Sequence, residues 1–447
     1  MLRRTMPREM KQSLGAAIAN PRFGIARGSA AAGGAATMPF VLTLILIGLF
    51  IPEELSFYVF GLRLTVIRLI FLLMTPVLLA RWTQKMSAGR YRFVLSDVFV
   101  VLTGFWFIYA PANVDGPMSA FNHAGPDVLE FCIGYMTTRI LLSDHGHALS
   151  FVEVLCRVIA VVALVGILDP LTNHRFAHDL AAQLGSPMHS IESWEDAHRL
   201  GLLRATGPIE HPILYGFTCT IGLILAVSIP VRGRRFAIFS CGIGTILAFS
   251  SAPIQVMLLG FALLTYDRIF SRIAFRWSAL IIAGAVTIMA AFLISNSPVG
   301  FVVSHLTFSP ESGYYREWTW HMVGLYVSQS PWVGLGFGER PEEINHSIDS
   351  LWLVLAIRSG YPGAVLVALS LFGAAAILTK GRKPDLTPVE AKLATTLGIL
   401  LFLTAYISCT VHLWGTSWIL TGLLIGMKAH LSELGYLRPD AARQRLS

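Results

Sequence analysis

The chain has 447 residues, of which 54% are hydrophobic and only 13% are charged, and its formal net charge is +8. Soluble domains carry about a quarter charged residues, so this balance and a mean hydropathy of +0.64 exclude an ordinary soluble protein and predict a polytopic membrane protein. The basic residues fall in short clusters between apolar segments, which indicates membrane topology and argues against nucleic acid as a partner.

Residues 1–37 are basic and rich in Ala and Gly, and we expect a flexible cytoplasmic tail there. About twelve apolar segments follow, and each is a predicted membrane-spanning helix. They lie near 38–52, 62–80, 96–111, 126–142, 150–168, 212–230, 235–250, 252–266, 277–295, 347–378, 391–410 and 412–428. The sequence therefore predicts a single all-α integral membrane domain over 38–430 and a cytoplasmic tail over 431–447. The segment 347–378 is overlong, and we expect it to be broken near Pro362, because proline disrupts helical hydrogen bonds.

Short basic connections set the expected orientation of these helices. Clusters of Arg and Lys occur in the second, sixth, eighth and tenth connections of the chain. They contain Arg81, Lys85, Arg90 and Arg92; Arg232, Arg234 and Arg235; Arg268, Arg272 and Arg276; and Lys380, Arg382 and Lys383. Under the positive-inside rule these connections and both termini face the cytoplasm. The long connections 169–211 and 296–346 then share the outer face.

The apolar segments contain few ionisable residues. These are Glu130, Arg139, Glu153, Arg157 and Arg358. Glu153 and Arg157 are one helical turn apart and can form a structural ion pair, although a charge inside a span is also a candidate for function. The five cysteines show no CxxC spacing, so neither a disulfide framework nor a zinc site is indicated.

The motif GLLRATGPIEHPILYG, at 201–216, places an arginine before the start of a predicted span. Arg204 precedes Gly207 and Pro208, and His211 with Pro212 opens the span. An arginine at the mouth of a helix bundle suits a phosphate, because its planar fork forms bidentate charge-assisted hydrogen bonds. The alternative is an interfacial arginine that only extends its charge toward water.

The stretch 309–363 is half apolar, although it lies between long apolar segments, and long loops without a role are uncommon. Within it, 316–330 predicts an amphipathic helix at the membrane surface, with Arg316 at its start. The predicted apolar face contains Trp318, Met322, Leu325 and Tyr326. The aromatic residues, which include Tyr315, fit an interface belt and equally fit a surface on which sugars stack. The alternative is a surface helix that binds no ligand.

The same stretch continues with a turn and a histidine. Gly334-x-Gly336-x-Gly338 lacks the dinucleotide-binding spacing and predicts a turn. His346 follows, and histidine is the side chain best suited to take a proton near neutral pH. Asp349 lies three residues further on, where it would orient the imidazole on a helix that starts near Ser347. A structural histidine at the membrane interface is the alternative.

Taken in order, these motifs resemble the O-antigen ligase and polymerase family of bacterial envelope glycosyltransferases. The resemblance covers about residues 200–370 by motif and the whole chain by architecture. It rests on Arg204, Gly207 and His211-Pro212, on Arg316, Trp320 and Pro331-x-x-Gly334-x-Gly336, and on His346. In this family the histidine is usually followed by asparagine, whereas here Ser347 follows His346 and Asn345 precedes it.

The resemblance implies a GT-C-like enzyme in the bacterial inner membrane, with about twelve spans and a large periplasmic loop that contains short amphipathic helices. The implied donor is a glycan on undecaprenyl diphosphate. His346 would activate the acceptor, and Arg204 and Arg316 would bind the diphosphate as further catalytic residues. Substrate binding would also involve His211, Tyr315 and Asp349. No metal or other cofactor would be required, because arginines supply the countercharge. Implied partners are membrane lipid, a chain-length regulator and a flippase.

Three functions follow as expectations. The first is a polymerase that transfers a lipid-linked glycan to the next lipid-linked repeat unit of O-antigen or exopolysaccharide. The second is a ligase, which shares donor and chemistry but transfers the finished glycan to lipid A–core. The third is a flippase or other transporter of lipid-linked glycans. Transport would need polar residues along a path through the bilayer, whereas these motifs gather at one face.

Overall fold

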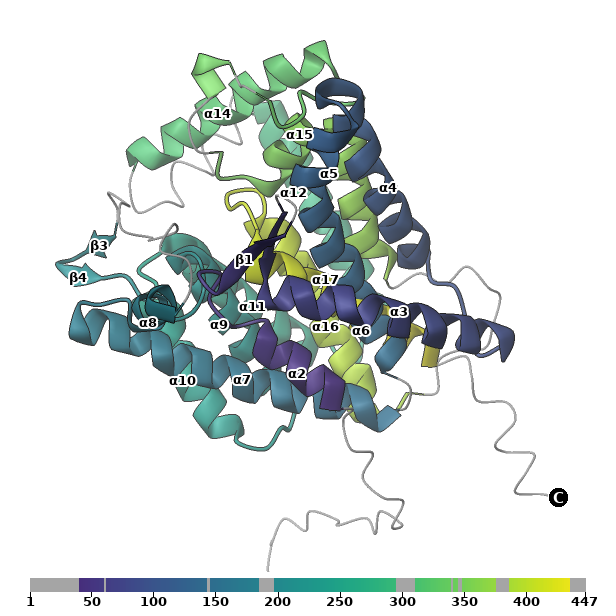
Figure 1. The fold of residues 1–447 in the computed structure, drawn as a ribbon. Coiled ribbons are helices and arrows are strands. Elements are labelled where there is room, and N and C mark those ends of the chain that lie inside the picture. Colours follow the sequence, from purple (N-terminus) through teal and green to yellow (C-terminus); the bar gives the residue numbers. More distant parts are fainter. Residues whose placement is uncertain are drawn as a thin grey trace, which may run out of the picture. The chain divides into compact units, whose positions relative to one another are not determined.

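A computed structural model describes residues 40–59, 62–142, 145–184, 197–294, 310–338, 341–344, 348–374 and 386–434. All of them belong to one unit of the chain, Thr37–Ser447. Helices dominate this part of the chain (Figure 1). The predicted tail at 1–37 lies outside the described residues. The last helix ends at Leu434, four residues past the predicted end of the membrane domain.

The N-terminal half begins with a helix and a hairpin and continues with long helices. Its elements are α2 (Phe40–Gly48), β1 (Ser56–Val59), β2 (Leu62–Thr65), α3 (Val66–Ser87), α4 (Leu95–Asp115), α5 (Pro117–Val128), the π-helix η1 (Leu129–Ile133), α6 (Gly134–Leu141), α7 (His145–Thr172) and α8 (Phe176–Leu184).

The C-terminal half opens with a second small hairpin. Its elements are β3 (His198–Arg199), β4 (Leu202–Leu203), α9 (Pro212–Ser228), α10 (Arg234–Leu247), α11 (Ser251–Ile269), α12 (Arg276–Ile294), α14 (Pro310–Gln329), the 3-10 helix η3 (Glu342–Ile344), α15 (Leu351–Gly373), α16 (Pro388–Ile407) and α17 (Gly415–Leu434).

Each predicted apolar segment contains a helix, and five helices in the described part of the chain are long and apolar enough to cross a membrane. These five are Val66–Ser87, Leu95–Asp115, His147–Thr172, Leu351–Gly373 and Pro388–Ile407. Helices suit a bilayer because they satisfy their backbone hydrogen bonds internally. The expected count of about twelve spans stays a prediction.

Two short antiparallel hairpins accompany the helices, and the structure otherwise agrees with the all-α prediction. β1 pairs with β2, with Ser56 opposite Thr65, and β3 pairs with β4, with His198 opposite Leu203. Both lie in connections between helices, and the second turns at Leu200 and Gly201, which have positive φ angles of 55° and 77°. Strands of two to four residues are too short to show a readable alternation of apolar and polar residues.

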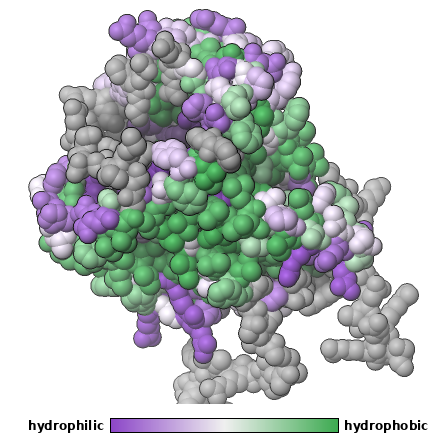
Figure 2. Space-filling view, viewed as in Figure 1, coloured by the Kyte–Doolittle hydropathy of each residue, from purple (hydrophilic) through white to green (hydrophobic). Residues whose placement is uncertain are grey.

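Large apolar side chains remain exposed on several helices, as expected for surfaces that face lipid. On α7 they include Val161 and Leu171, and on α2 they include Phe40 and Ile47. Figure 2 shows apolar residues gathered over the area of α2 and α7, with polar residues above and below in this view. This arrangement agrees with the apolar composition of the chain.

Several charged groups within the helices form ion pairs. Arg139 is 0% exposed, and its Nε donates to Asp97 Oδ1 over 2.9 Å while its Nη1 donates to Glu433. The other groups pair as Arg68 with Glu130, Arg358 with Asp127, and Arg157 with Glu153. The expected ion pair of Glu153 and Arg157 is therefore confirmed. A buried charge is costly unless paired, so the pairs of Arg139, Arg68 and Arg358 fix neighbouring elements against one another, whereas the pair of Arg157 and Glu153 lies within α7.

The predicted helix around 316–330 is present as α14, and part of the apolar face that is predicted to lie on the membrane is exposed, while another face packs inside the protein. Trp318 and Leu325 are 41% and 50% exposed. The buried residues are instead Thr319, Val323 and Val327, which recur every fourth position. Val323 and Val327 belong to a small separate hydrophobic core that they share with residues of α15. Packing against α15 therefore decides which face of α14 is buried.

The predicted break in the long C-terminal span is confirmed, but it falls at Gly360 rather than at Pro362. Gly360 has φ 67° and ψ 178° inside α15. The turn series at 331–338 packs against this break: Leu335 N–H donates to Ile357 O over 2.6 Å, and Tyr361 N–H donates to Pro331 O over 2.9 Å. A Cβ at position 360 would lie 2.1 Å from Trp332 O, so only glycine allows this approach.

Candidate functional site

Arg204 is held in a buried loop between β4 and α9. Only 3% of the residue is exposed. Its Nε donates to Ala248 O over 3.1 Å, and Arg199 on β3 donates from Nη1 to the neighbouring Phe249 O over 3.0 Å. Two arginines from one hairpin region are thus held on the same turn, between α10 and α11.

Asp169, at the end of α7, shapes the loop that carries Arg204. Its Oδ2 accepts hydrogen bonds from the backbone N–H groups of Thr206 and Gly207, both over 2.8 Å, and from Thr206 Oγ1 over 3.0 Å. Gly207 has φ 56°, and a Cβ there would lie 3.1 Å from Gly166 N and from Val162 O. The glycine in this motif therefore permits close packing of the loop on α7.

Two further contacts fix the end of the loop. His178 on α8 hydrogen-bonds Glu54 Oε1 through Nδ1 over 2.8 Å and Ile209 O through Nε2 over 3.1 Å. Burial opposes the charge on His178, but its hydrogen bond and ion pair with Glu54 raise the pKa of the imidazole above its usual value. Glu210 Oε1 accepts from Thr416 N and Oγ1, at the start of α17. The loop is therefore anchored on three helices.

His211 caps α9 as a neutral imidazole. Its Nδ1 accepts a hydrogen bond from Ile213 N–H over 3.1 Å. Burial and the positive charges of Arg204, Arg175 and Arg199 lower the pKa of His211 to about 3. Because Nδ1 is an acceptor, the neutral ring carries its proton on Nε2, which is a donor. The structure thus places three arginines around a histidine that can donate but is a poor base.

A small cavity between α14 and α15 is lined by Arg316, Tyr315 and Asp349. Its volume is about 10 Å³, and its other walls include Thr319, Trp320 and Ser350. Arg316 Nε is buried without a hydrogen-bond partner among the described residues. Burial lowers the pKa of Arg316, the charge of Asp349 opposes this shift, and Arg199 adds to it. Arg199 therefore contributes to the potential at both Arg316 and His211.

The predicted base, His346, lies outside the described residues, together with Asn345 and Ser347. The expectation that Asp349 lies on a helix starting near Ser347 is wrong, because α15 begins at Leu351 with Ser350 as its N-cap. The structure brings Arg204 to His211 and brings Tyr315, Arg316 and Asp349 into one cavity.

Several residues of this region were missed by reading the sequence. Arg175 and Arg199 stand in a polar connection without a motif, and Asp169 looks like the end of an apolar span. Glu53 and Glu210 form a carboxyl pair near Gly415, where an added Cβ would lie 2.9 Å and 2.4 Å from their Oε1 atoms. Burial and the charge of Glu53 raise the pKa of Glu210 to about 7. Only the fold places these distant segments together.

Metal coordination finds no support in the described ranges, where no three His, Cys, Asp or Glu side chains form a candidate metal site. No family model matches the chain, and no curated protein matches it either.

Proposed function

We propose that the chain is a metal-independent membrane glycosyltransferase that polymerises undecaprenyl-diphosphate-linked repeat units into O-antigen or exopolysaccharide at the periplasmic face of the inner membrane. The observation that carries the proposal is the positive potential that Arg204, Arg175 and Arg199 impose on buried His211, at the end of the anchored loop that carries Arg204. A diphosphate is a dense anion, and arginines recognise its oxygens through paired, charge-assisted hydrogen bonds.

The residues suit the leaving-group half of a glycosyl transfer. The bond between the donor sugar and the diphosphate breaks, and the acceptor hydroxyl oxygen forms the new bond to that sugar. Arg204 and Arg316 stabilise the charge that develops on the departing diphosphate, and His211 donates from Nε2 to one of its oxygens. Such stabilisation requires fixed donors, and the anchored 204–211 loop supplies them.

The acceptor half needs a group that takes the proton of the attacking hydroxyl. We assign this step to His346, following the family resemblance, because an imidazole is suited to general-base catalysis near neutral pH. His211 is unsuited to it, since burial and arginines depress its pKa to about 3. Tyr315 and Asp349 are proposed to contact the glycan beside Arg316.

The test is glycan transfer by the purified full-length chain in lipid nanodiscs supplied with lipid-linked repeat units. We expect a ladder of polymer lengths on the carrier lipid, and we expect His346→Ala to abolish it. His321→Ala is the matched control, because His321 is exposed on α14. Full activity of His346→Ala would overturn the catalytic assignment.

The same assay separates the alternative functions. Product only after addition of lipid A–core would identify a ligase. Movement of the lipid-linked glycan across the bilayer without any new glycosidic bond would identify a transporter.

A further inference from the structure

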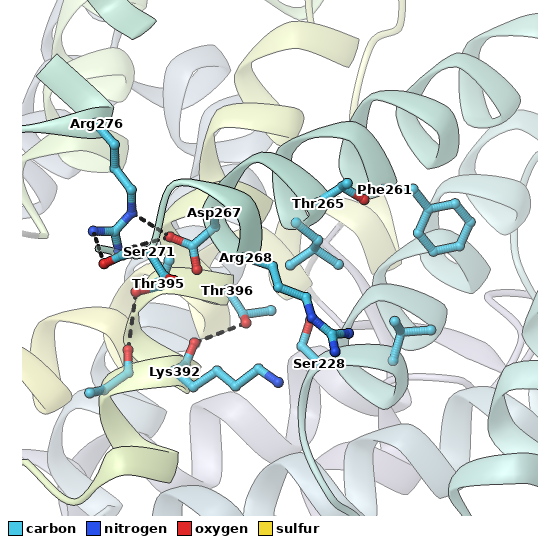
Figure 3. Close-up of a pocket in the computed structure, with 13 residues that line it drawn as sticks. Ser228, Phe261, Thr265, Asp267, Arg268, Ser271, Arg276, Lys392, Thr395 and Thr396 are labelled. Atoms are coloured by element: carbon cyan, nitrogen blue, oxygen red, sulfur yellow. Dashed lines mark hydrogen bonds and ion pairs between the residues drawn. The ribbon is translucent and has the colours of Figure 1, made fainter. Parts of the chain in front are cut away.

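A second polar cavity lies at the other end of α9 from His211. It has a volume of about 600 Å³, which is within the range of ligand pockets. Its walls come from the ends of α9 and α11 and the starts of α12 and α16 (Figure 3). α9 has 17 residues, so about 25 Å of helix separates the two regions. These helix ends border the basic connections that are predicted to face the cytoplasm.

Two cations in this cavity have no acidic partner. Arg268 and Lys392 line it from α11 and α16, and within the described ranges neither forms an ion pair. The one carboxylate in the lining, Asp267, is bound by Arg276 over 2.9 Å. The cavity therefore holds two positive charges that its own acidic group does not neutralise.

A buried hydroxyl lies in the same wall. Ser228 is 5% exposed, and its Oγ has no hydrogen-bond partner among the described residues. Figure 3 shows the side chains of Arg268 and Lys392 extending toward Ser228. Buried polar atoms are rarely left without a partner, so an unpaired hydroxyl beside two cations indicates that a ligand supplies acceptor atoms there.

Apolar residues complete the cavity. Val227, Phe261 and Leu264 line it together with the polar groups. A ligand that matches this lining carries an anionic oxygen cluster on one side and hydrocarbon on the other. Basic pockets between membrane helices on the cytoplasmic side bind phospholipid head groups in this way.

We propose that this cavity binds a phosphate group, held by Arg268, Lys392 and Ser228, and that its source is an anionic phospholipid of the inner leaflet. The proposal does not depend on glycosyltransferase activity. A bound lipid would join α9, α11 and α16 from the side opposite the Arg204 loop.

The experiment titrates the delipidated full-length chain, in detergent, with phosphatidylglycerol, with phosphatidylcholine and with inorganic phosphate, and follows thermal stabilisation. We expect phosphatidylglycerol to stabilise the chain at lower concentration than phosphatidylcholine. The double variant Arg268→Gln, Lys392→Gln should weaken that effect about tenfold or more, because two charge-assisted contacts are lost. Ser228→Ala should weaken it less, and Lys392→Arg should retain it.

The matched control is Arg235→Gln with Arg272→Gln, which removes two exposed basic residues that do not line the cavity. It should leave the lipid response within about twofold, because Arg235 and Arg272 are exposed like Arg268 and Lys392 but lie outside the cavity. Equal responses to the two lipids, or an equal loss in both double variants, would overturn the proposal. If inorganic phosphate stabilised the chain and phosphatidylglycerol were no better than phosphatidylcholine, the cavity would be a site for a soluble anion. The proposed phospholipid would then be excluded.

Discussion

At the residue scale, the loop around Arg204 shows how a buried guanidinium is held by main-chain groups. Ala248 O accepts from Arg204, and Asp169 accepts three hydrogen bonds from Thr206 and Gly207. Exposed ion pairs hold a side chain weakly, because water and salt screen them, whereas the carbonyl that accepts from Arg204 belongs to the capped end of α10. Asp169 is therefore a positioning residue for Arg204.

Replacing Asp169 by Asn should loosen this loop. The neutral amide accepts hydrogen bonds less strongly than a carboxylate, and we expect a loss of about 1–3 kcal/mol in stability. Thermal unfolding of the purified chain measures the change. Asp179→Asn is the control, because Asp179 is 57% exposed at its side chain. Equal unfolding temperatures for the two variants would show that Asp169 does not hold the loop.

Glu210 should make stability depend on pH. Its pKa in the folded chain is raised to about 7 by burial and by Glu53, whereas an unfolded Glu titrates near about 4.3. The folded state binds this proton more tightly, so stability should fall as pH rises from about 4.5 to about 7. Glu210→Gln mimics the protonated acid and should unfold at a higher temperature than the wild type at pH 8, but not at pH 5.

The control for this variant is Glu342→Gln, because Glu342 is exposed. It should change the unfolding temperature equally at both pH values. If Glu210→Gln behaved in the same way, Glu210 would titrate as an ordinary carboxyl.

At the scale of elements, the break in α15 is the feature that positions the turn at 331–338. The break exposes carbonyl groups, and the chain satisfies them: Ile357 O accepts from Leu335 N–H, and Ser359 O accepts from Trp106 Nε1 on α4 over 2.8 Å. Gly336 lies against Asp115 at the end of α4, whose Oδ2 accepts from Phe337 N–H over 2.6 Å. The C-terminal end of α4 is thus tied, through the turn at 331–338, to the break in α15.

Gly360→Ala should be strongly destabilising. The new Cβ would meet Trp332 O at 2.1 Å, in a conformation with φ 67°. We expect a loss of more than about 2 kcal/mol, measured by thermal unfolding in detergent. Gly324→Ala, in the open interior of α14, should be neutral or stabilising by about 0.5–1 kcal/mol. Similar losses in both variants would contradict the role of the break.

The sequence predicted the helices well because apolar length is a local property. It predicted the break in α15 within two residues, since Gly360 and Pro362 are both visible signals. It did not show that Val323 and Val327 pack against α15, because this contact between two helices has no signal in the local sequence. It found Arg204, His211 and Arg316 through motifs, but Arg199, Asp169 and Glu210 gain their places only from contacts between distant segments.

At the scale of the whole unit, the two polar regions lie at opposite ends of α9. Arg204 and His211 lie at its start, and the cavity with Arg268 and Lys392 lies at its end. Arg139, which joins α4, α6 and α17, is fully buried and paired. The apolar helix α9 therefore separates the cations of the cavity from the arginines near His211. Such a separation suits a bilayer, whose hydrocarbon core would lie between two polar surfaces.

This arrangement predicts the sidedness of two exposed positions. A cysteine at Gln329, the last residue of α14, should react with a membrane-impermeant maleimide in intact spheroplasts. A cysteine at Arg272, between α11 and α12, should react only after permeabilisation. The background is Cys409→Ser, because Cys409 is the exposed native cysteine among those described. Labelling of both positions from the same side would reject the predicted orientation.

The central claim is that Arg204 and Arg316 act on the diphosphate of a glycan donor. The most direct measurement is the rate of glycan transfer from lipid-linked repeat units by the purified Arg204→Gln and Arg316→Gln variants, with Arg81→Gln as control. Loss of one fixed donor to developing charge typically costs about 10²–10³-fold in rate, so we expect each variant to lose at least about 100-fold and the control to retain full activity. Wild-type rates in both arginine variants would contradict the account.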